Sequence, residues 1–204
     1  MSAPDYSLET ALLSQGCFAV AGVDEVGRGA LAGPVVVAAV ILNPDCLPAG
    51  LDDSKKLSAR SREYLFDLIL KDARAICVAL APASEVDRVN IRQATLSSMR
   101  RAVAGLAIRP DHALIDGRDI PPHLPCPATA LIKGDGRSIS IAAASIIAKV
   151  MRDRLMVRLD AAAPGYGFIR HVGYGTAAHL AGLNQLGGSR FHRLSFAPLK
   201  TIRL

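Results

Sequence analysis

The sequence predicts a single α/β domain, residues 1–204, with a central mixed β-sheet flanked by helices. Three observations lead to this prediction. The chain has 204 residues, half of them apolar, which is enough for one buried core. Two apolar runs rich in β-branched residues, 20–23 and 34–42, follow each other with only a loop between them. Three later apolar runs cover residues 75–80, 112–115 and 128–132. Helical segments precede the first two of them, but a Pro-rich connection joins the last two, so the order is not a strict strand–helix repeat.

The helical segments are identified by apolar spacing and by capping residues. Ser58 stands in an N-cap position ahead of a segment whose apolar residues recur at helical spacing. The next helical stretch is long, and we expect a break in it near Asn90. The last two segments are Ala-rich and amphipathic, and they form a basic C-terminal helical part. The predicted helices cover residues 58–73, 83–106, 138–162 and 176–186.

The positive charge of the chain is concentrated in its C-terminal third. The formal net charge is +6, yet residues 137–204 hold ten Lys and Arg against only two acids, Asp153 and Asp160. A local positive field of this kind favours a polyanion such as nucleic acid, because each neutralised phosphate releases counterions. An ordinary solvated surface remains an alternative interpretation of the charge alone.

Several protein classes are excluded by composition. The four cysteines are scattered without a CxxC pair, which argues against a zinc knuckle and a disulfide scaffold. No Lys or Arg precedes Arg28, so the basic region of a signal peptide is missing. The longest apolar stretch, 30–42, contains Pro34 and is shorter than the ~20 residues that span a bilayer. We therefore expect a cytoplasmic protein with no membrane segment.

A glycine-rich segment follows the first predicted strand. Residues 27–32 (GRGALA) match the loose dinucleotide-binding fingerprint, but a Gly-Pro pair and a second strand follow instead of the required helix. The absence of a side chain on Gly27 and Gly29 permits close approach of the backbone to a ligand, and Arg28 supplies donors for a phosphate or a base edge. A simple tight hairpin is the alternative.

Acidic residues follow several of the predicted strands. Asp24 and Glu25 end the first strand, Asp116 ends another, and Asp135 follows a third. Converging carboxylates without His or Cys indicate Mg²⁺ or Mn²⁺, and a pair of such ions suits phosphodiester hydrolysis. Adjacent strand residues face opposite ways, so we expect the strand to end or bulge at Asp24 and Glu25.

A second group of polar residues lies on the predicted helix 138–162. Ser145, Lys149 and Arg152 are spaced i, i+4 and i+7, so they share one face that could follow a phosphate backbone. Asp153 is expected to pair locally, although a metal role is left open. Lys55 and Lys56, taken alone, would face solvent.

The chain resembles the bacterial ribonuclease HII family, the type 2 ribonucleases H. The matching motifs occur in order along nearly the whole chain, and the DEVGRG segment is highly specific. They are AGVDEVGRGALAGPVV (21–36), DDSKKLS (52–58), LIDG (114–117), KGD (133–135), AAASIIAKVMRDR (142–154), YGF (166–168), HVGYGT (171–176) and HRLSF (192–196). The resemblance implies a ribonuclease H-like fold.

The resemblance also implies roles for individual residues. The four catalytic, metal-binding acids would be Asp24, Glu25, Asp116 and Asp135, with Mn²⁺ or Mg²⁺. The 2′-hydroxyl at an RNA–DNA junction would be recognised by Gly27, Arg28 and Gly29, while Tyr174 would stack on the following deoxyribose. Phosphate contacts would come from Lys55, Ser145, Lys149, His171 and Thr176. Val172 departs from the family, which commonly has lysine there, so one phosphate contact is missing.

The expected function is endonucleolytic cleavage 5′ to a ribonucleotide in an RNA–DNA hybrid or in duplex DNA. The products would be a 3′-hydroxyl and a 5′-phosphate, and the role would be ribonucleotide excision repair and primer removal. We expect a monomer. We also expect no sliding-clamp motif, because the chain ends soon after HRLSF. Two alternatives stay open, a different polynucleotidyl transferase of the same fold and a hybrid-binding module without activity. The clustered acids argue against the second, since they destabilise a protein that binds no metal.

Overall fold

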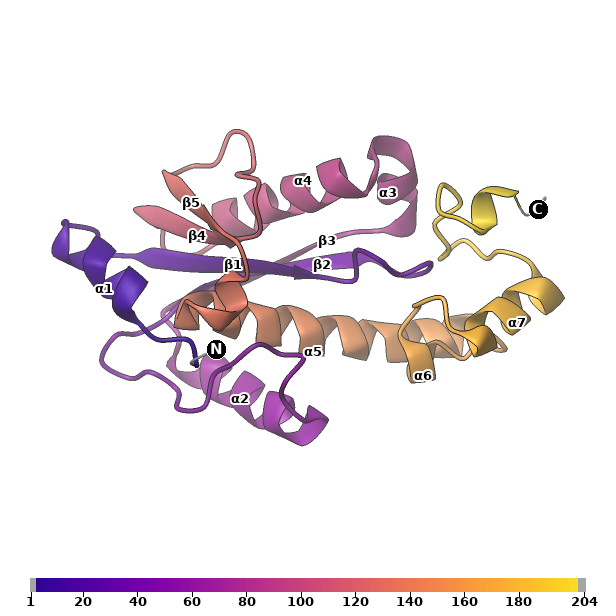
Figure 1. The fold of residues 1–204 in the computed structure, drawn as a ribbon, viewed down its shortest axis with the longest axis horizontal. Coiled ribbons are helices and arrows are strands. Elements are labelled where there is room, and N and C mark those ends of the chain that lie inside the picture. The colour runs from indigo at the N-terminus through magenta and orange to yellow at the C-terminus, as the bar shows by residue number, and fades with distance from the viewer. Residues whose placement is uncertain (1–2, 202–204) are drawn as a thin grey trace.

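A five-stranded mixed sheet forms the centre of the protein (Figure 1). The computed structural model describes residues 3–201. The strand order is β3-β2-β1-β4-β5, with antiparallel pairing of β1, β2 and β3 and parallel pairing of β1, β4 and β5. The predicted mixed sheet is therefore confirmed. The strands are β1 (Val20–Val26), β2 (Val35–Ile41), β3 (Ala75–Ala81), β4 (His112–Asp116) and β5 (Ala128–Leu131).

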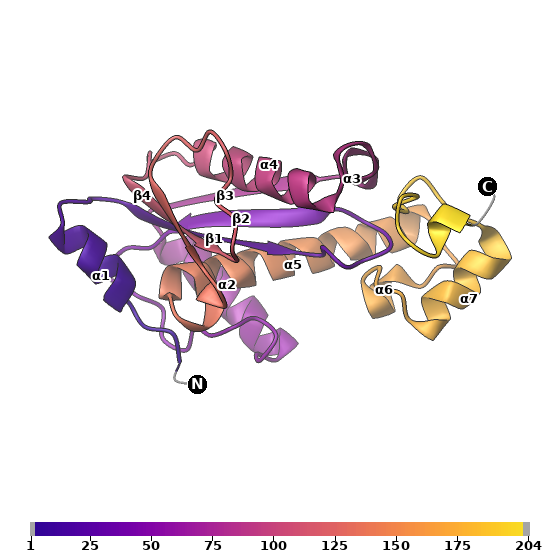
Figure 2. The ribbon, with the colours of Figure 1, turned by 45° about the horizontal axis from the view of Figure 1, so that its top comes forward.

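Helices cover both faces of this sheet. Figures 1 and 2 show α3 and α4 on one face, α5 along the other with α2 beside it, and α6 and α7 at the far end of α5. Two short 3₁₀ helices complete the fold. The helices are α1 (Ser7–Ser14), α2 (Ala59–Asp72), α3 (Ala83–Val89), α4 (Ile91–Ala104), α5 (Ile139–Ala162), α6 (Phe168–His171), α7 (Ala177–Leu186), η1 (Gly134–Gly136) and η2 (Leu199–Thr201).

The predicted helix positions agree with the structure, including the break near Asn90. Asn90 has a φ of 69° between α3 and α4, and its side chain accepts a hydrogen bond from the Gln93 amide. Ser58, Ser138 and Thr176 cap the starts of α2, α5 and α7 in the same manner. Sequence analysis missed α1, which is only eight residues long and lacks a side-chain cap.

Alternating residues of the central strands divide the core into two layers. Val35 and Val37 face the α4 side, whereas Val36 and Ala38 face the α5 side. The α5 layer contains many alanines, and Gly22 of β1 lies where α5 begins. A Cβ on Gly22 would be 2.1 Å from the Ser140 carbonyl carbon. Small residues therefore allow α5 to approach β1 closely.

Helix α1 is attached to the start of α5 through a buried carboxylate. Glu9 is fully buried and accepts hydrogen bonds from Ser138 Oγ at 2.5 Å and from the Ser140 amide at 3.0 Å. A negative charge is favourable at a helix N-terminus, where amide groups lack partners within the helix. Glu9 thus fixes the chain segment that directly follows Asp135.

Within residues 3–201, every helix is too short or too polar to cross a bilayer.

We expect Gly22→Ala to destabilise the fold, because the added methyl group forces α5 away from β1. The expected loss is about 1–3 kcal/mol in the free energy of unfolding. Urea denaturation would measure it, with Gly136→Ala as the control, because a Cβ at Gly136 meets no atom within 4 Å. Equal unfolding midpoints for the two variants would contradict the close-packing argument.

Candidate active site

Three carboxylates meet where β4 ends beside β1. The ladder between these strands stops at Val23↔Ile115, whereas β1 continues to Val26 paired with β2 alone. Asp116, the last residue of β4, therefore lies next to Asp24 on the same face of the sheet. One carboxylate oxygen each from Asp24, Glu25 and Asp116 lies within 4.8 Å of the other two.

The expected strand end or bulge at Asp24 and Glu25 is wrong. Both residues lie inside β1, and their regular register with β2 continues through Val26↔Val36. Glu25 faces the α4 side of the sheet and Asp24 the α5 side. Because β4 stops earlier, the edge of β1 is open here, and the longer Glu25 side chain can reach the same space as Asp24.

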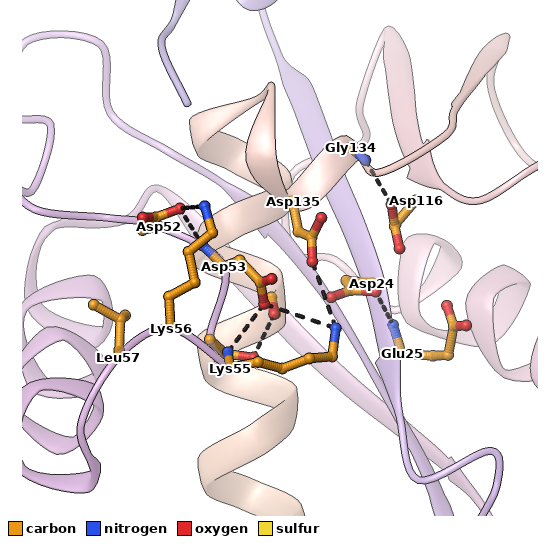
Figure 3. A network of polar contacts seen from close by, with 12 residues as sticks. Asp24, Glu25, Asp52, Asp53, Lys55, Lys56, Leu57, Asp116, Gly134 and Asp135 are labelled. Atoms are coloured by element: carbon orange, nitrogen blue, oxygen red, sulfur yellow. Dashed lines mark hydrogen bonds and ion pairs between the residues drawn. The ribbon is translucent and has the colours of Figure 1, made fainter. Parts of the chain in front are cut away.

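Backbone amides orient two of these acids. Asp116 Oδ1 accepts a hydrogen bond from the Gly134 amide at 2.7 Å, and Asp24 Oδ1 accepts one from the Glu25 amide at 2.7 Å (Figure 3). Gly134 has no room for a side chain, since a Cβ would lie 2.6 Å from Ile141 Cδ1. Glu25 Oε1 accepts from Arg28 Nη1 at 3.1 Å, but Glu25 Oε2 is buried without a partner among the described residues.

Burial makes the clustered negative charge costly. Loss of solvent, followed by the charges of Glu25 and Asp116, raises the pKa of Asp24 well above its usual range. Burial likewise raises the pKa of Glu25 and that of Asp135. Arg28 offsets only part of this negative charge, and one Glu25 oxygen has no partner among the described residues. Such a set of oxygen donors fits a hard divalent cation.

Asp135 approaches this cluster from η1 without joining the group of three. It is 8% exposed, and its Oδ2 lies 3.6 Å from Lys55 Nζ. The charge of Asp135 contributes to the raised pKa of Asp24, and the charge of Asp116 contributes to the raised pKa of Asp135. The four predicted acids therefore lie in one region, with Asp24, Glu25 and Asp116 as its tightest part.

Two buried arginines hold the glycine-rich loop from the inside. Arg193 donates to the carbonyl oxygens of Gly27, Arg28 and Gly33 at 2.8–3.2 Å. Arg152 donates to those of Ala32 and Pro34 at 3.2 and 3.0 Å. Both guanidinium groups are fully buried, and within residues 3–201 neither pairs with a carboxylate.

This arrangement explains why the loop needs glycine. Gly27 has a φ of +90°, and a Cβ there would lie 2.1 Å from Arg152 Nε. Tyr174 lies beside the loop with its side chain partly exposed, and its ring centroid is 5.6 Å from Arg152 Cζ. The exposed Arg28 side chain, Gly29 and Tyr174 are therefore positioned together next to the acids.

Three buried histidines form hydrogen bonds with the main chain around Tyr174 and with each other. His179 Nδ1 donates to the Tyr174 carbonyl at 3.0 Å, and its Nε2 lies 3.0 Å from His192 Nε2. His171 Nε2 donates to the Tyr166 carbonyl, and its Nδ1 accepts from the Gly173 amide. The His171 ring is therefore buried with both nitrogens bonded to main-chain groups, so its predicted phosphate contact stays a prediction that the ring as placed here does not favour.

The predicted phosphate-binding row on α5 is also wrong. Ser145 is buried and donates to Ser54 Oγ at 2.7 Å, and Arg152 is buried beneath the glycine loop. Lys149 remains partly exposed, where it pairs with Asp153 at 2.8 Å, so the expected local pairing of Asp153 is confirmed. Thr176 is exposed and caps α7. The shared face exists, but most of it points into the protein.

Sequence analysis missed the structural part played by Arg193 and by Glu9. Arg193 lies within the HRLSF motif (192–196), which marked it as part of a family segment without indicating a role. Glu9 carries no such signal, because α1 precedes the recognised motifs.

Comparison with known proteins decides the family. The family model described as Ribonuclease HII matches residues 21–199. The chain belongs to the ribonuclease HII family. It is 55% identical to ribonuclease HII of Brucella canis over 199 residues, which cover 97% of this chain and 90% of that protein.

Solved structures of ribonuclease HII and H2 are similar in fold. The ribonuclease H2 of Pyrococcus horikoshii superposes with a TM-score of 0.77 at 26% identity, covering 90% of this chain and 96% of that one. The ribonuclease HII of Archaeoglobus fulgidus, in a structure of its complex with PCNA, gives 0.76 at 28% identity, covering 88% and 95%. The ribonuclease H-like fold is therefore confirmed, and membership of this family makes the chain a hydrolase of the ribonuclease H type.

We expect Asp24→Asn to stabilise the metal-free protein at pH 7 while cleavage falls by about 100-fold or more. The folded-state pKa of Asp24 lies above the usual value of 3.8, so the folded protein binds more protons than the unfolded chain between these values. Stability therefore falls as the pH rises through that window, and Asn removes the loss.

Thermal unfolding in EDTA at several pH values tests this expectation. The advantage of Asp24→Asn should shrink as the pH is lowered towards 4. Asp119→Asn is the matched control, because hydrogen bonding to Arg92 lowers the pKa of Asp119 and its charge is favourable. A lower melting temperature for Asp24→Asn at pH 7 would contradict the electrostatic argument.

Arg193→Lys should loosen the glycine loop, since an ammonium group cannot donate to three carbonyls in the fixed geometry of a guanidinium group. We expect kcat/KM on an RNA–DNA hybrid to fall by about 10- to 100-fold. Arg190→Lys is the control, because Arg190 contacts only the Phe191 ring among the interactions described. Unchanged kcat/KM for Arg193→Lys would show that the loop does not depend on this group.

Proposed function

We propose that this member of the ribonuclease HII family hydrolyses the phosphodiester bond 5′ to a ribonucleotide, in a hybrid or embedded in duplex DNA. The products are a 3′-hydroxyl and a 5′-phosphate. The observation that carries the proposal is the contact between the glycine loop and the acids. Arg28 Nη1 lies 3.1 Å from Glu25 Oε1, so a sugar held at the loop would lie beside the carboxylate cluster.

The acids would hold the metal ions of the reaction. Asp24, Glu25 and Asp116, together with Asp135, supply oxygen donors from β1, β4 and η1. A pair of Mg²⁺ or Mn²⁺ ions, when bound, provides activation of water and stabilisation of the leaving 3′-oxygen. The chain itself keeps Asp116 oriented through the Gly134 amide and keeps Glu25 near the loop through Arg28.

Specificity for RNA would come from the loop and Tyr174. The backbone of Gly27 and Gly29 and the Arg28 side chain would contact the 2′-hydroxyl, the group that distinguishes RNA from DNA. Tyr174 would stack on the next deoxyribose. Lys55, Lys149 and Thr176 remain as candidate phosphate contacts. The buried His171 ring would instead hold the main chain of Tyr166 and Gly173, and Ser145 would hold Ser54.

The cellular role that follows is removal of misincorporated ribonucleotides and RNA primers in the cytoplasm. The single domain would act as a monomer on its duplex. The excess of positive charge in residues 137–204 supports binding of the phosphate backbone on this side.

Cleavage of a labelled DNA duplex with one ribonucleotide tests the proposal, alongside an all-DNA duplex and an RNA–DNA hybrid. We expect one nick 5′ to the ribonucleotide in Mg²⁺ or Mn²⁺, none in EDTA and none in the all-DNA duplex. Product ends are identified by ligation and by phosphatase treatment. Cleavage of all-DNA duplex would indicate another polynucleotidyl transferase, and binding without cleavage would indicate a hybrid-binding module.

A further inference from the structure

Lys55 projects from a loop that is fixed on two sides. Ser54 is buried, accepts a hydrogen bond from Ser145 Oγ at 2.7 Å, and bonds through its carbonyl to Arg62 Nη1 at 2.9 Å. The Lys55 amide donates to Asp53 Oδ1 at 3.0 Å. Contacts to α5 and α2 therefore fix the loop that carries Lys55, and its side chain extends from this loop into largely exposed space.

The Lys55 ammonium group lies against the catalytic acids. Its Nζ is 3.6 Å from Asp135 Oδ2 and 3.7 Å from Asp53 Oδ1, as Figure 3 shows. Partial burial lowers its pKa, but the carboxylates of Asp53 and Asp135, and then those of Asp24 and Asp116, raise it more strongly. Lys55 is thus a fully charged cation within the field of the acidic cluster.

The neighbouring Lys56 behaves differently. Its Nζ lies 2.8 Å from Asp52 Oδ1, and Figure 3 shows its side chain ending at Asp52 and not at Asp135. The two lysines are adjacent in sequence and both exposed, so Lys56 is a matched reference for Lys55.

The geometry at Asp135 is that of a loose ion pair. The separation of 3.6 Å exceeds a normal hydrogen bond, and the Lys55 side chain is 78% exposed. Such a pair is weak and easily exchanged. The ammonium group therefore balances charge at Asp135 without blocking its replacement by a stronger cation.

We propose that Lys55 is an internal counter-cation that competes with a divalent cation at Asp135 and leaves Asp135 when a nucleic-acid phosphate arrives. This inference rests on the proposed function, in which Asp135 is a metal ligand. A metal ion at Asp135 displaces Lys55 and leaves it available to a phosphate, and a phosphate bound to Lys55 leaves Asp135 available to the metal. Each binding event therefore strengthens the other by the same factor.

Mn²⁺ titration by isothermal calorimetry tests the proposal on wild type, Lys55→Gln and Lys56→Gln. Without nucleic acid, Lys55→Gln should bind Mn²⁺ about two- to fivefold more tightly than wild type, and Lys56→Gln should match wild type. The gain should disappear in Lys55→Gln with Asp135→Asn, compared with Asp135→Asn alone. Adding an all-DNA duplex should tighten Mn²⁺ binding in wild type but not in Lys55→Gln.

The outcomes separate this inference from the proposed function. Equal or weaker Mn²⁺ binding by Lys55→Gln overturns the competition, even if wild type binds Mn²⁺ and cleaves the ribonucleotide substrate. An equal gain in Lys56→Gln also overturns it, because a general loss of positive charge would then explain the effect. Failure of every variant to bind Mn²⁺ overturns the metal assignment and the inference together.

Discussion

The arrangement of the whole site depends on the close contact between α5 and the central strand β1. This contact exists because Gly22 has no side chain and the facing part of α5 consists largely of alanine. With α5 in this position, successive residues along the helix contact different parts of the site. Its start follows Asp135, Ser145 holds the loop of Lys55, and Arg152 lies beneath the glycine loop.

The same architecture forces acids into a region where they are poorly solvated. Clustered carboxylates lower stability unless a cation compensates them, so the fold must supply the compensating energy elsewhere. Burial of two apolar layers, one on each face of the sheet, contributes this compensating free energy of folding. Arg28 and Lys55 offset only part of the negative charge, from the rim of the site. Stability and affinity for cations are therefore opposing demands on the same few side chains.

Local patterns predicted the elements but not how they meet. The strands and most helices follow from apolar spacing and caps, and the acids were found because they end or follow strands. The joint position of Asp24 and Glu25 was interpreted wrongly, because it depends on β4 being shorter than β1, which is a property of pairing between distant segments. Helical spacing correctly grouped Ser145 with Arg152, but spacing does not reveal which side of a helix faces the protein interior.

Two buried histidines in the C-terminal part form a chain of hydrogen bonds in which every N–H group donates in the same direction. Because the Ser189 amide donates to His192 Nδ1, His192 Nε2 carries the proton and donates to His179, which in turn donates to the Tyr174 carbonyl. Burial, followed by the charge of His179, lowers the pKa of His192 to about 4. An additional proton on either ring would place two N–H groups against each other, at the His179–His192 contact or at the Ser189 amide. The main chain at Tyr174 is therefore tied to the segment around Ser189 by a relay that needs both rings in their neutral form.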